Sequence, residues 1–239
     1  MTLRRHAHLR PAGIWGVVGW ALAVMLAVAK GGAAQTAADL QLVLAVDASG
    51  SVDQVRFELQ KRGYVAAFRH ARVLQAIRSG PNRAIAVTMV QWTGPMLQVQ
   101  VVGWTLIGDE ESAAAFSDAI ERAPRQLFGG GTSISGAIDY GGTLLARSSF
   151  RANRRVIDVS GDGSNNRGRP VTLARDEAVA AGIGLNGLPI LALEPDLDRY
   201  YYDSVIGGPG AFVVAARNYE TFADAILKKL IIEIAANGR

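Results

Sequence analysis

The sequence predicts one α/β domain with a doubly wound, mostly parallel central sheet, one antiparallel edge strand and helices on both faces. The nearly continuous apolar run LQLVLAV at 40–46 is typical of a strand covered on both faces of a parallel sheet. Further apolar runs alternate with helical segments, as in successive strand and helix units. The runs at 83–92 and 97–104 are joined by a turn too short for a parallel crossover, so this pair is antiparallel. A chain of 239 residues is long enough to bury the core of such a domain.

The first half of the domain contains three predicted helices. SVDQ at 51–54 has the spacing of a capped helix start and predicts a helix over 53–77. The turn-forming residues at 79–82 end this helix. After the antiparallel pair, helices are expected over 109–122 and, beyond a glycine-rich loop, up to residue 147.

The second half continues the alternation. Six elements are expected here, namely strands over 154–160, 188–193 and 211–215 and helices over 170–181, 197–205 and 219–235. The closing helix carries Phe222, Ile226 and Leu230 at four-residue spacing, which predicts an apolar face toward the sheet.

Residues 1–34 have the layout of a secretory signal peptide. Arg4, Arg5 and Arg10 precede an apolar stretch at 14–29, and small residues follow. Cleavage after Ala34 is preferred over cleavage after Ala29. An uncleaved membrane anchor is the alternative, but the apolar stretch is shorter than the roughly 18–20 residues that span a bilayer. We therefore expect a periplasmic or secreted protein with no stable membrane span after cleavage.

Charge and composition exclude several classes of function. Residues 1–34 hold 4 of the 25 Lys and Arg and none of the 21 Asp and Glu, which leaves 21 against 21 in the rest. The basic balance therefore belongs to the leader, and no nucleic-acid partner is expected. Cysteine is absent, and His70 is the one histidine after the leader. These facts exclude cysteine chemistry and argue against a zinc site or a Ser-His-Asp triad.

Oxygen-bearing side chains occur where predicted strands end. Asp47, Ser49 and Ser51 alternate directly after the first strand, so an extended backbone directs them to one side. Asp162 follows the strand at 154–160, and Thr132 follows three glycines in a third loop. Open α/β sheets bind ligands beyond the carboxyl ends of their strands. We therefore expect these five residues to lie together.

Two carboxylates and three hydroxyls suit a hard divalent cation. Mg²⁺ is the first choice, with Mn²⁺ or Ca²⁺ as alternatives. Two carboxylates only neutralise such an ion, so an incoming anionic oxygen is still attracted. Each residue alone has a plainer interpretation as a helix cap or turn former. Five such positions in three loops favour the metal site.

These motifs resemble the von Willebrand factor type A domain with its metal-ion-dependent adhesion site. The resemblance covers residues 39–236, and VDASGSVD, VQWTG and DVSGDGSNN are similar to a bacterial branch catalogued as a domain of unknown function. It implies that Asp47, Ser49, Ser51, Thr132 and Asp162 are the metal-site residues. It also implies a binding module rather than an enzyme, whose protein partner supplies a carboxylate to the metal. The departure is Gly161, where many members have Thr or Ser before the aspartate.

Two other functions remain open from the sequence. A phosphoester hydrolase could use Asp47, although Ser49 stands where the aspartyl phosphatases need a second aspartate. A scaffold could keep the fold without metal. The motifs of P-loop proteins and of Gly-x-Ser-x-Gly hydrolases are missing. We interpret Asn165 and Asn166 as turn formers, Trp92 as a half-buried packing residue and His70 as solvated surface.

Overall fold

The structure is a computed structural model, and it describes residues 35–235. The expected signal peptide at 1–34 lies outside the described residues. Within them, no helix is both long enough and apolar enough to cross a membrane.

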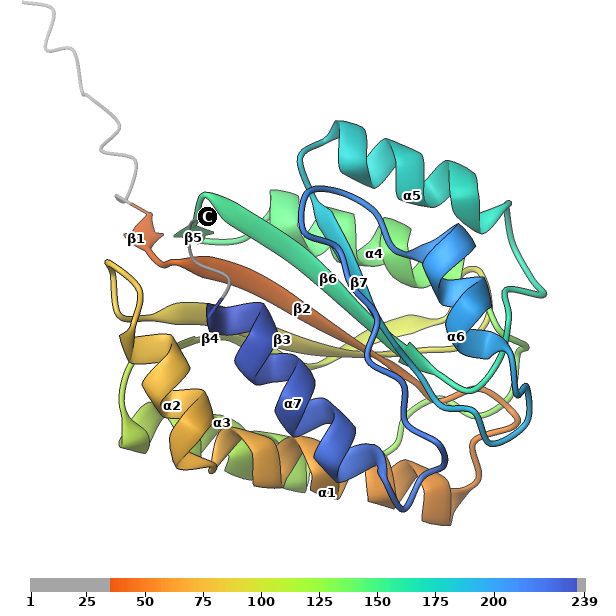
Figure 1. Cartoon of the computed structure of the whole chain (residues 1–239), viewed down its shortest axis with the longest axis horizontal. Coiled ribbons are helices and arrows are strands. Elements are labelled where there is room, and N and C mark those ends of the chain that lie inside the picture. Colours follow the sequence, from red (N-terminus) through yellow and green to blue (C-terminus); the bar gives the residue numbers. More distant parts are fainter. Residues whose placement is uncertain (1–34, 236–239) are drawn as a thin grey trace, which may run out of the picture. The chain divides into compact units, whose positions relative to one another are not determined.

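The domain is built on a five-stranded sheet with the order β4-β3-β2-β6-β7 (Figure 1). Its strands are β2 (Leu40–Asp47), β3 (Ile85–Trp92), β4 (Gln98–Ile107), β6 (Arg154–Gly161) and β7 (Gly184–Pro189). β2 pairs in parallel with both β3 and β6, β6 pairs in parallel with β7, and only the edge strand β4 is antiparallel to its neighbour. The predicted fold class is confirmed. A separate short pair joins β1 (Thr36–Ala37) to β5 (Phe150–Arg151).

Helices cover both faces of this sheet (Figure 1). One face carries α1 (Gln54–Phe68), α2 (Ala71–Arg78), α3 (Glu110–Arg122) and α7 (Phe222–Ala235). The other carries α4 (Ile134–Ala146), α5 (Val171–Ala180) and α6 (Leu197–Tyr200), which continues into the π-helical turn η1 (Tyr201–Val205).

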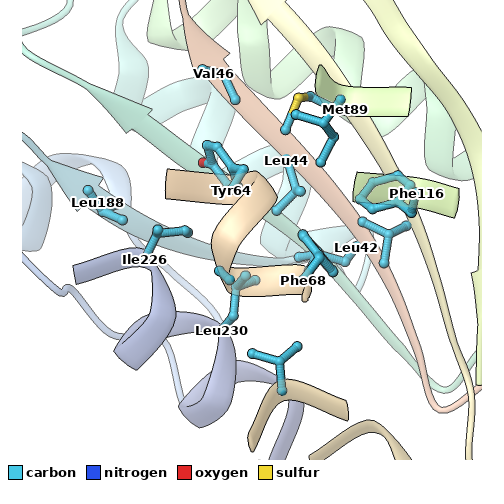
Figure 2. Packing of buried hydrophobic residues seen from close by; sticks show 14 of the residues in the cluster. Leu42, Leu44, Val46, Tyr64, Phe68, Met89, Phe116, Leu188, Ile226 and Leu230 are labelled. Atoms are coloured by element: carbon cyan, nitrogen blue, oxygen red, sulfur yellow. The ribbon is translucent and has the colours of Figure 1, made fainter. Parts of the chain in front are cut away.

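The central strand β2 is buried on both faces, which explains its continuous apolar sequence. Leu42, Leu44 and Val46 pack toward α1 and α7, as Figure 2 shows, whereas Val43 and Ala45 belong to the cluster on the opposite face. Alternate residues of a strand point to opposite faces. This packing holds the carboxyl end of β2 in a fixed position, and that end carries the candidate site.

The prediction of a single helix over 53–77 is wrong in one respect, because two helices, α1 and α2, occupy this segment. His70 has an extended backbone with ψ of 130°, and its Nδ1 accepts a hydrogen bond from the backbone N–H of Arg72 at 3.1 Å. His70 is exposed, as expected, but it is also the N-cap of the second helix.

Two predicted strands are also corrected. The strand expected at 188–193 lies at β7, several residues earlier, where its backbone pairs with Val156–Gly161 of β6. The segment 211–215 forms no strand; it contributes a single bridge between Gly187 and Val213. Glycine has a low strand propensity, which hid the GLNGL segment of β7, but pairing with a buried neighbour overrides that propensity.

Candidate metal site

The candidate site lies at the carboxyl edge of the sheet, between its two central parallel strands. Asp47 is the last residue of β2, and Asp162 follows directly after β6. β2 pairs with β6 in parallel register, with Val46 opposite Ser160. The carboxyl ends of the two strands therefore meet, and the two aspartates approach each other from neighbouring loops.

Four of the five predicted residues form a continuous chain of hydrogen bonds. Asp47 Oδ1 accepts from the backbone N–H of Ser49 at 2.7 Å. The hydroxyls of Ser49 and Ser51 lie 3.1 Å apart, and the Ser51 hydroxyl donates to Asp162 Oδ1 at 2.6 Å. The structure thus brings the oxygens of Asp47, Ser49, Ser51 and Asp162 to one place.

Thr132, which follows the glycine loop, lies at the edge of this cluster and is not hydrogen-bonded to it in the contacts of the described residues. Gly129, Gly130 and Gly131 all have left-handed φ values, at 74°, 95° and 80°. Such values favour glycine and allow the loop to fold tightly against its neighbours. A Cβ built on Gly163 would lie 3.6 Å from Thr132 Oγ1, so this hydroxyl borders the Asp162 loop.

Asn165 and Asn166 have a larger role than the turn-forming one predicted from sequence. Asn166 Oδ1 accepts from the backbone N–H of Thr132 at 3.0 Å, and the backbone N–H of Asn166 donates to the Thr132 carbonyl at 2.9 Å. Asn165 Oδ1 accepts from the backbone N–H of Ser135 at 3.0 Å. The two asparagines fasten the Thr132 loop to the Asp162 loop, and their place directly after Gly-Asp-Gly-Ser was the available signal.

Two arginines hold the backbone of the first loop. Arg56 Nη1 donates to the carbonyl of Ser51 at 2.7 Å. Arg125 Nη2 donates to the carbonyls of Ala48 and Ser49, at 3.1 Å and 3.2 Å. These bonds hold the backbone of the loop whose Ser51 hydroxyl donates to Asp162 Oδ1. Neither arginine was singled out from the sequence.

The inner wall of the site is made of buried aromatic side chains. The Tyr219 hydroxyl donates to Asp162 Oδ2 at 2.8 Å, a contact that sequence reasoning missed. Trp92 is fully buried rather than half-buried. A Cβ on Gly161 would lie 2.9 Å from Asp47 Oδ2, 3.0 Å from the Tyr201 hydroxyl and 3.1 Å from the Trp92 ring. The absence of a side chain at Gly161 therefore gives the Asp47 carboxyl its room.

We expect Gly161→Ala to lower the free energy of unfolding by about 1–3 kcal/mol, because the added methyl group overfills this wall. Gly103 is the matched control, since a Cβ there meets no atom within 4 Å. Urea denaturation measures both variants. An equal effect of the two substitutions would contradict the assigned role of Gly161.

The electrostatics of Asp47 suit a bound cation. Its side chain is fully buried, and its Oδ2 has no hydrogen-bond partner among the described residues. Burial, and secondarily the negative charge of Asp162, raise the pKa of Asp47 to about 7. A cation between the two carboxylates would offset both effects. In the part of the chain described, no group of three or more His, Cys, Asp and Glu could hold a metal, so hydroxyl ligands would be needed here.

The domain has the von Willebrand factor type A fold. It is similar to a von Willebrand factor type A protein from Catenulispora acidiphila, with a TM-score of 0.58 and 18% identity over 82% of this chain and 43% of that one. It is also similar to proximal thread matrix protein 1 from the mussel byssus, which is described with a zinc-occupied MIDAS motif. Here the TM-score is 0.58 and the identity 13%, over 84% of this chain and 47% of that one. For the SpRpn10 VWA domain the TM-score is 0.55 and the identity 14%, over 79% of this chain and 94% of that one.

The chain belongs to the family described as "Protein of unknown function (DUF1194)", which matches residues 37–238. The predicted resemblance to a type A domain of an unknown-function branch is therefore confirmed. This chain spans less than half the length of the first two similar structures. No curated protein sequence matches it. At these identities the structural likeness establishes the fold, and the function must be argued from the site.

Proposed function

We propose that this chain is an exported, non-enzymatic binding module that holds a divalent cation and engages a carboxylate of a protein partner through it. The proposed metal-site residues are Asp47, Ser49, Ser51, Thr132 and Asp162. Mg²⁺ is the proposed ion, with Mn²⁺ or Ca²⁺ as alternatives. Export rests on the leader at 1–34, which lies outside the described residues.

One observation carries the proposal: the Ser49 hydroxyl contacts the Ser51 hydroxyl, which donates to Asp162 Oδ1, and the buried Asp47 carboxyl that precedes them has an unpaired oxygen among the described residues. Two carboxyl groups and two hydroxyls therefore lie together, and the charge of Asp162 contributes to the raised pKa of Asp47. When bound, a hard cation would supply a positive centre with room for an outside oxygen. The residues around it have supporting roles, because Tyr219 orients Asp162 while Arg56 and Arg125 fix the first loop.

The alternative functions gain no comparable support. For the phosphoester hydrolase, the residue two positions after Asp47 would have to act as an acid or base, and Ser49 instead contacts the Ser51 hydroxyl. A metal-free scaffold is the alternative that the titration below decides. Because the byssus protein is described with zinc in its motif, Zn²⁺ belongs among the ions tested.

Calorimetric titration of Mg²⁺ or Mn²⁺ into the purified protein is expected to show one site, which Asp162→Ala removes. Asp162 would lose both its ligand role and its hydrogen bond from Ser51. Asp176→Ala is the control, because that exposed carboxylate contacts only the neighbouring Arg175 in the described ion pairs. If neither the wild type nor the control binds any of these ions, the scaffold hypothesis replaces the proposal.

A further inference from the structure

Large apolar side chains are exposed around the candidate metal site. Eight such side chains are exposed in the described residues: Val55, Met96, Leu97, Phe128, Leu173, Leu193, Tyr202 and Ile232. Three of them lie in the glycine loop or in the turn beside it. These are Met96 and Leu97, in the turn between β3 and β4, and Phe128, directly before Gly129. Met96 is 90% exposed and Phe128 68% exposed.

Contacts join these side chains to the site itself. A Cβ on Gly130 would lie 2.9 Å from Leu97 Cδ1, so Leu97 covers the loop that carries Thr132. The Phe128 ring lies 4.7 Å from the guanidinium carbon of Arg125, which in turn binds the carbonyls of Ala48 and Ser49. Leu97 and Phe128 therefore adjoin the loops that hold the metal-site oxygens, and the exposed Met96 precedes Leu97 in the same turn. We call Met96, Leu97 and Phe128 the apolar surface.

Two arginines lie beside Phe128 and the glycine loop. Arg125 lies between Phe128 and the first loop. The exposed Arg167 packs over the glycine loop, since a Cβ on Gly131 would lie 2.6 Å from its Cγ. Positive charge next to exposed apolar groups complements a ligand that combines an acidic group with apolar neighbours.

We propose that the surface formed by Met96, Leu97 and Phe128 binds apolar side chains on either side of the partner's carboxylate. The partner segment would then carry an aspartate or glutamate between bulky apolar residues. This inference rests on the proposed function, because the metal site is what places the carboxylate. Apolar anchors beside a charged contact commonly supply most of the affinity of a protein interface.

The test uses a display library of peptides with one fixed aspartate and randomised flanks, panned on the purified protein in millimolar Mg²⁺. The selected peptides are expected to be enriched in Leu, Ile, Met, Phe and Trp beside the aspartate. For a synthetic peptide of the enriched sequence, Met96→Ser and Phe128→Ser should each weaken binding about tenfold, the loss typical of one buried apolar anchor. Replacing the fixed aspartate by asparagine should abolish binding.

Two controls separate this inference from the proposed function. Ile232→Ser alters an exposed apolar side chain near the carboxyl end of α7 and should leave peptide binding unchanged. Calorimetry should give the same metal affinity for Met96→Ser, Phe128→Ser and the wild type. Normal metal binding without apolar enrichment would overturn the docking surface alone, whereas absence of metal binding would overturn both proposals. Binding to phosphatidylglycerol vesicles that Met96→Ser removes, without peptide enrichment, would instead assign the surface to a membrane.

Discussion

Replacing Lys229 by methionine is expected to lower the free energy of unfolding by about 3–5 kcal/mol, because it breaks a buried ion-pair network. Lys229 Nζ lies 2.7 Å from Asp158 Oδ1 and 2.7 Å from Glu233 Oε2. All three side chains are fully buried. Without the lysine, two carboxylates would remain in the interior with no cation between them.

The surroundings of this network explain why it cannot simply open to water. Asp158 lies on β6, beneath α7, which supplies both Lys229 and Glu233. Asn186 Nδ2 of β7 donates to Glu233 Oε1 at 2.7 Å, and Lys229 Nζ lies 5.0 Å from the centre of the Phe212 ring. The network therefore fastens the closing helix to two strands of the sheet.

The loss of stability caused by Lys229→Met should depend on pH. Burial raises the pKa of Asp158 to about 7 even though the charge of Lys229 opposes this rise. Removing the lysine should raise the pKa of Asp158 further. The unfolded chain loses this proton above the ordinary aspartate pKa near 4, whereas the folded variant retains it to a higher pH. Stability of the variant therefore falls as pH rises through this window, and the deficit is larger at pH 8 than at pH 5.

Urea denaturation at these two pH values measures the effect. Lys228→Met is the matched control, because Lys228 precedes Lys229 in the same helix and its side chain is exposed. We expect this variant to change the free energy of unfolding by no more than about 0.5 kcal/mol. Equal losses for Lys228→Met and Lys229→Met would show that the buried network does not stabilise the domain.

The sequence reveals the central strands because each carries a strong local pattern. β2 is a nearly continuous apolar run, and β6 contains the β-branched residues Val156, Ile157 and Val159. Both strands lead into polar residues, and this pattern locates the edge of the sheet where ligands bind. The strand β7 was misplaced because its GLNGLP sequence has little strand propensity, and only its pairing with β6 defines it. The Lys229 network was missed because a lysine in a helix predicts a solvated surface unless its distant partners are known.

The sequence also predicts part of the candidate site. Alternation within 47–51 follows from backbone geometry, so the placing of Asp47, Ser49 and Ser51 on one side could be read from the sequence. The hydrogen bond from Tyr219 to Asp162 joins positions that are far apart in the chain, and no local pattern indicates it. Tyr219 precedes α7, and the apolar face predicted for that helix does not indicate where the tyrosine hydroxyl lies.

Asp47→Asn is expected to make the metal-free protein more stable at pH 8 while removing its response to Mg²⁺. The pKa of Asp47 is raised from 3.8 to about 7, with burial as the larger cause and Asp162 as the second. A tenfold change in an acid dissociation constant corresponds to about 1.4 kcal/mol, so ionised Asp47 costs the metal-free protein at most about 4 kcal/mol. An asparagine keeps the acceptor for the Ser49 N–H but carries no charge.

The sign of the pH dependence follows from linkage. Between pH 4 and pH 7 the folded protein retains a proton on Asp47 that the unfolded chain has lost, so stability falls as pH rises through this interval. The advantage of Asp47→Asn should therefore be small near pH 4, grow to pH 7 and level off above it. Comparison with the wild type removes the separate contribution of Asp158, which both proteins share.

Chemical denaturation in chelator and in Mg²⁺, from pH 5 to pH 8, tests both parts of this prediction. An ion at a hundred times its dissociation constant stabilises the folded state by about 2.7 kcal/mol. The wild type should gain this amount and Asp47→Asn should not. Asp176→Asn, at an exposed carboxylate, should behave as the wild type does. Parallel pH profiles for Asp47→Asn and the wild type would refute the charge argument, and equal gains from Mg²⁺ would exclude Asp47 from the metal site. If both effects appear, the charge that destabilises the metal-free domain is the one that binds the ion.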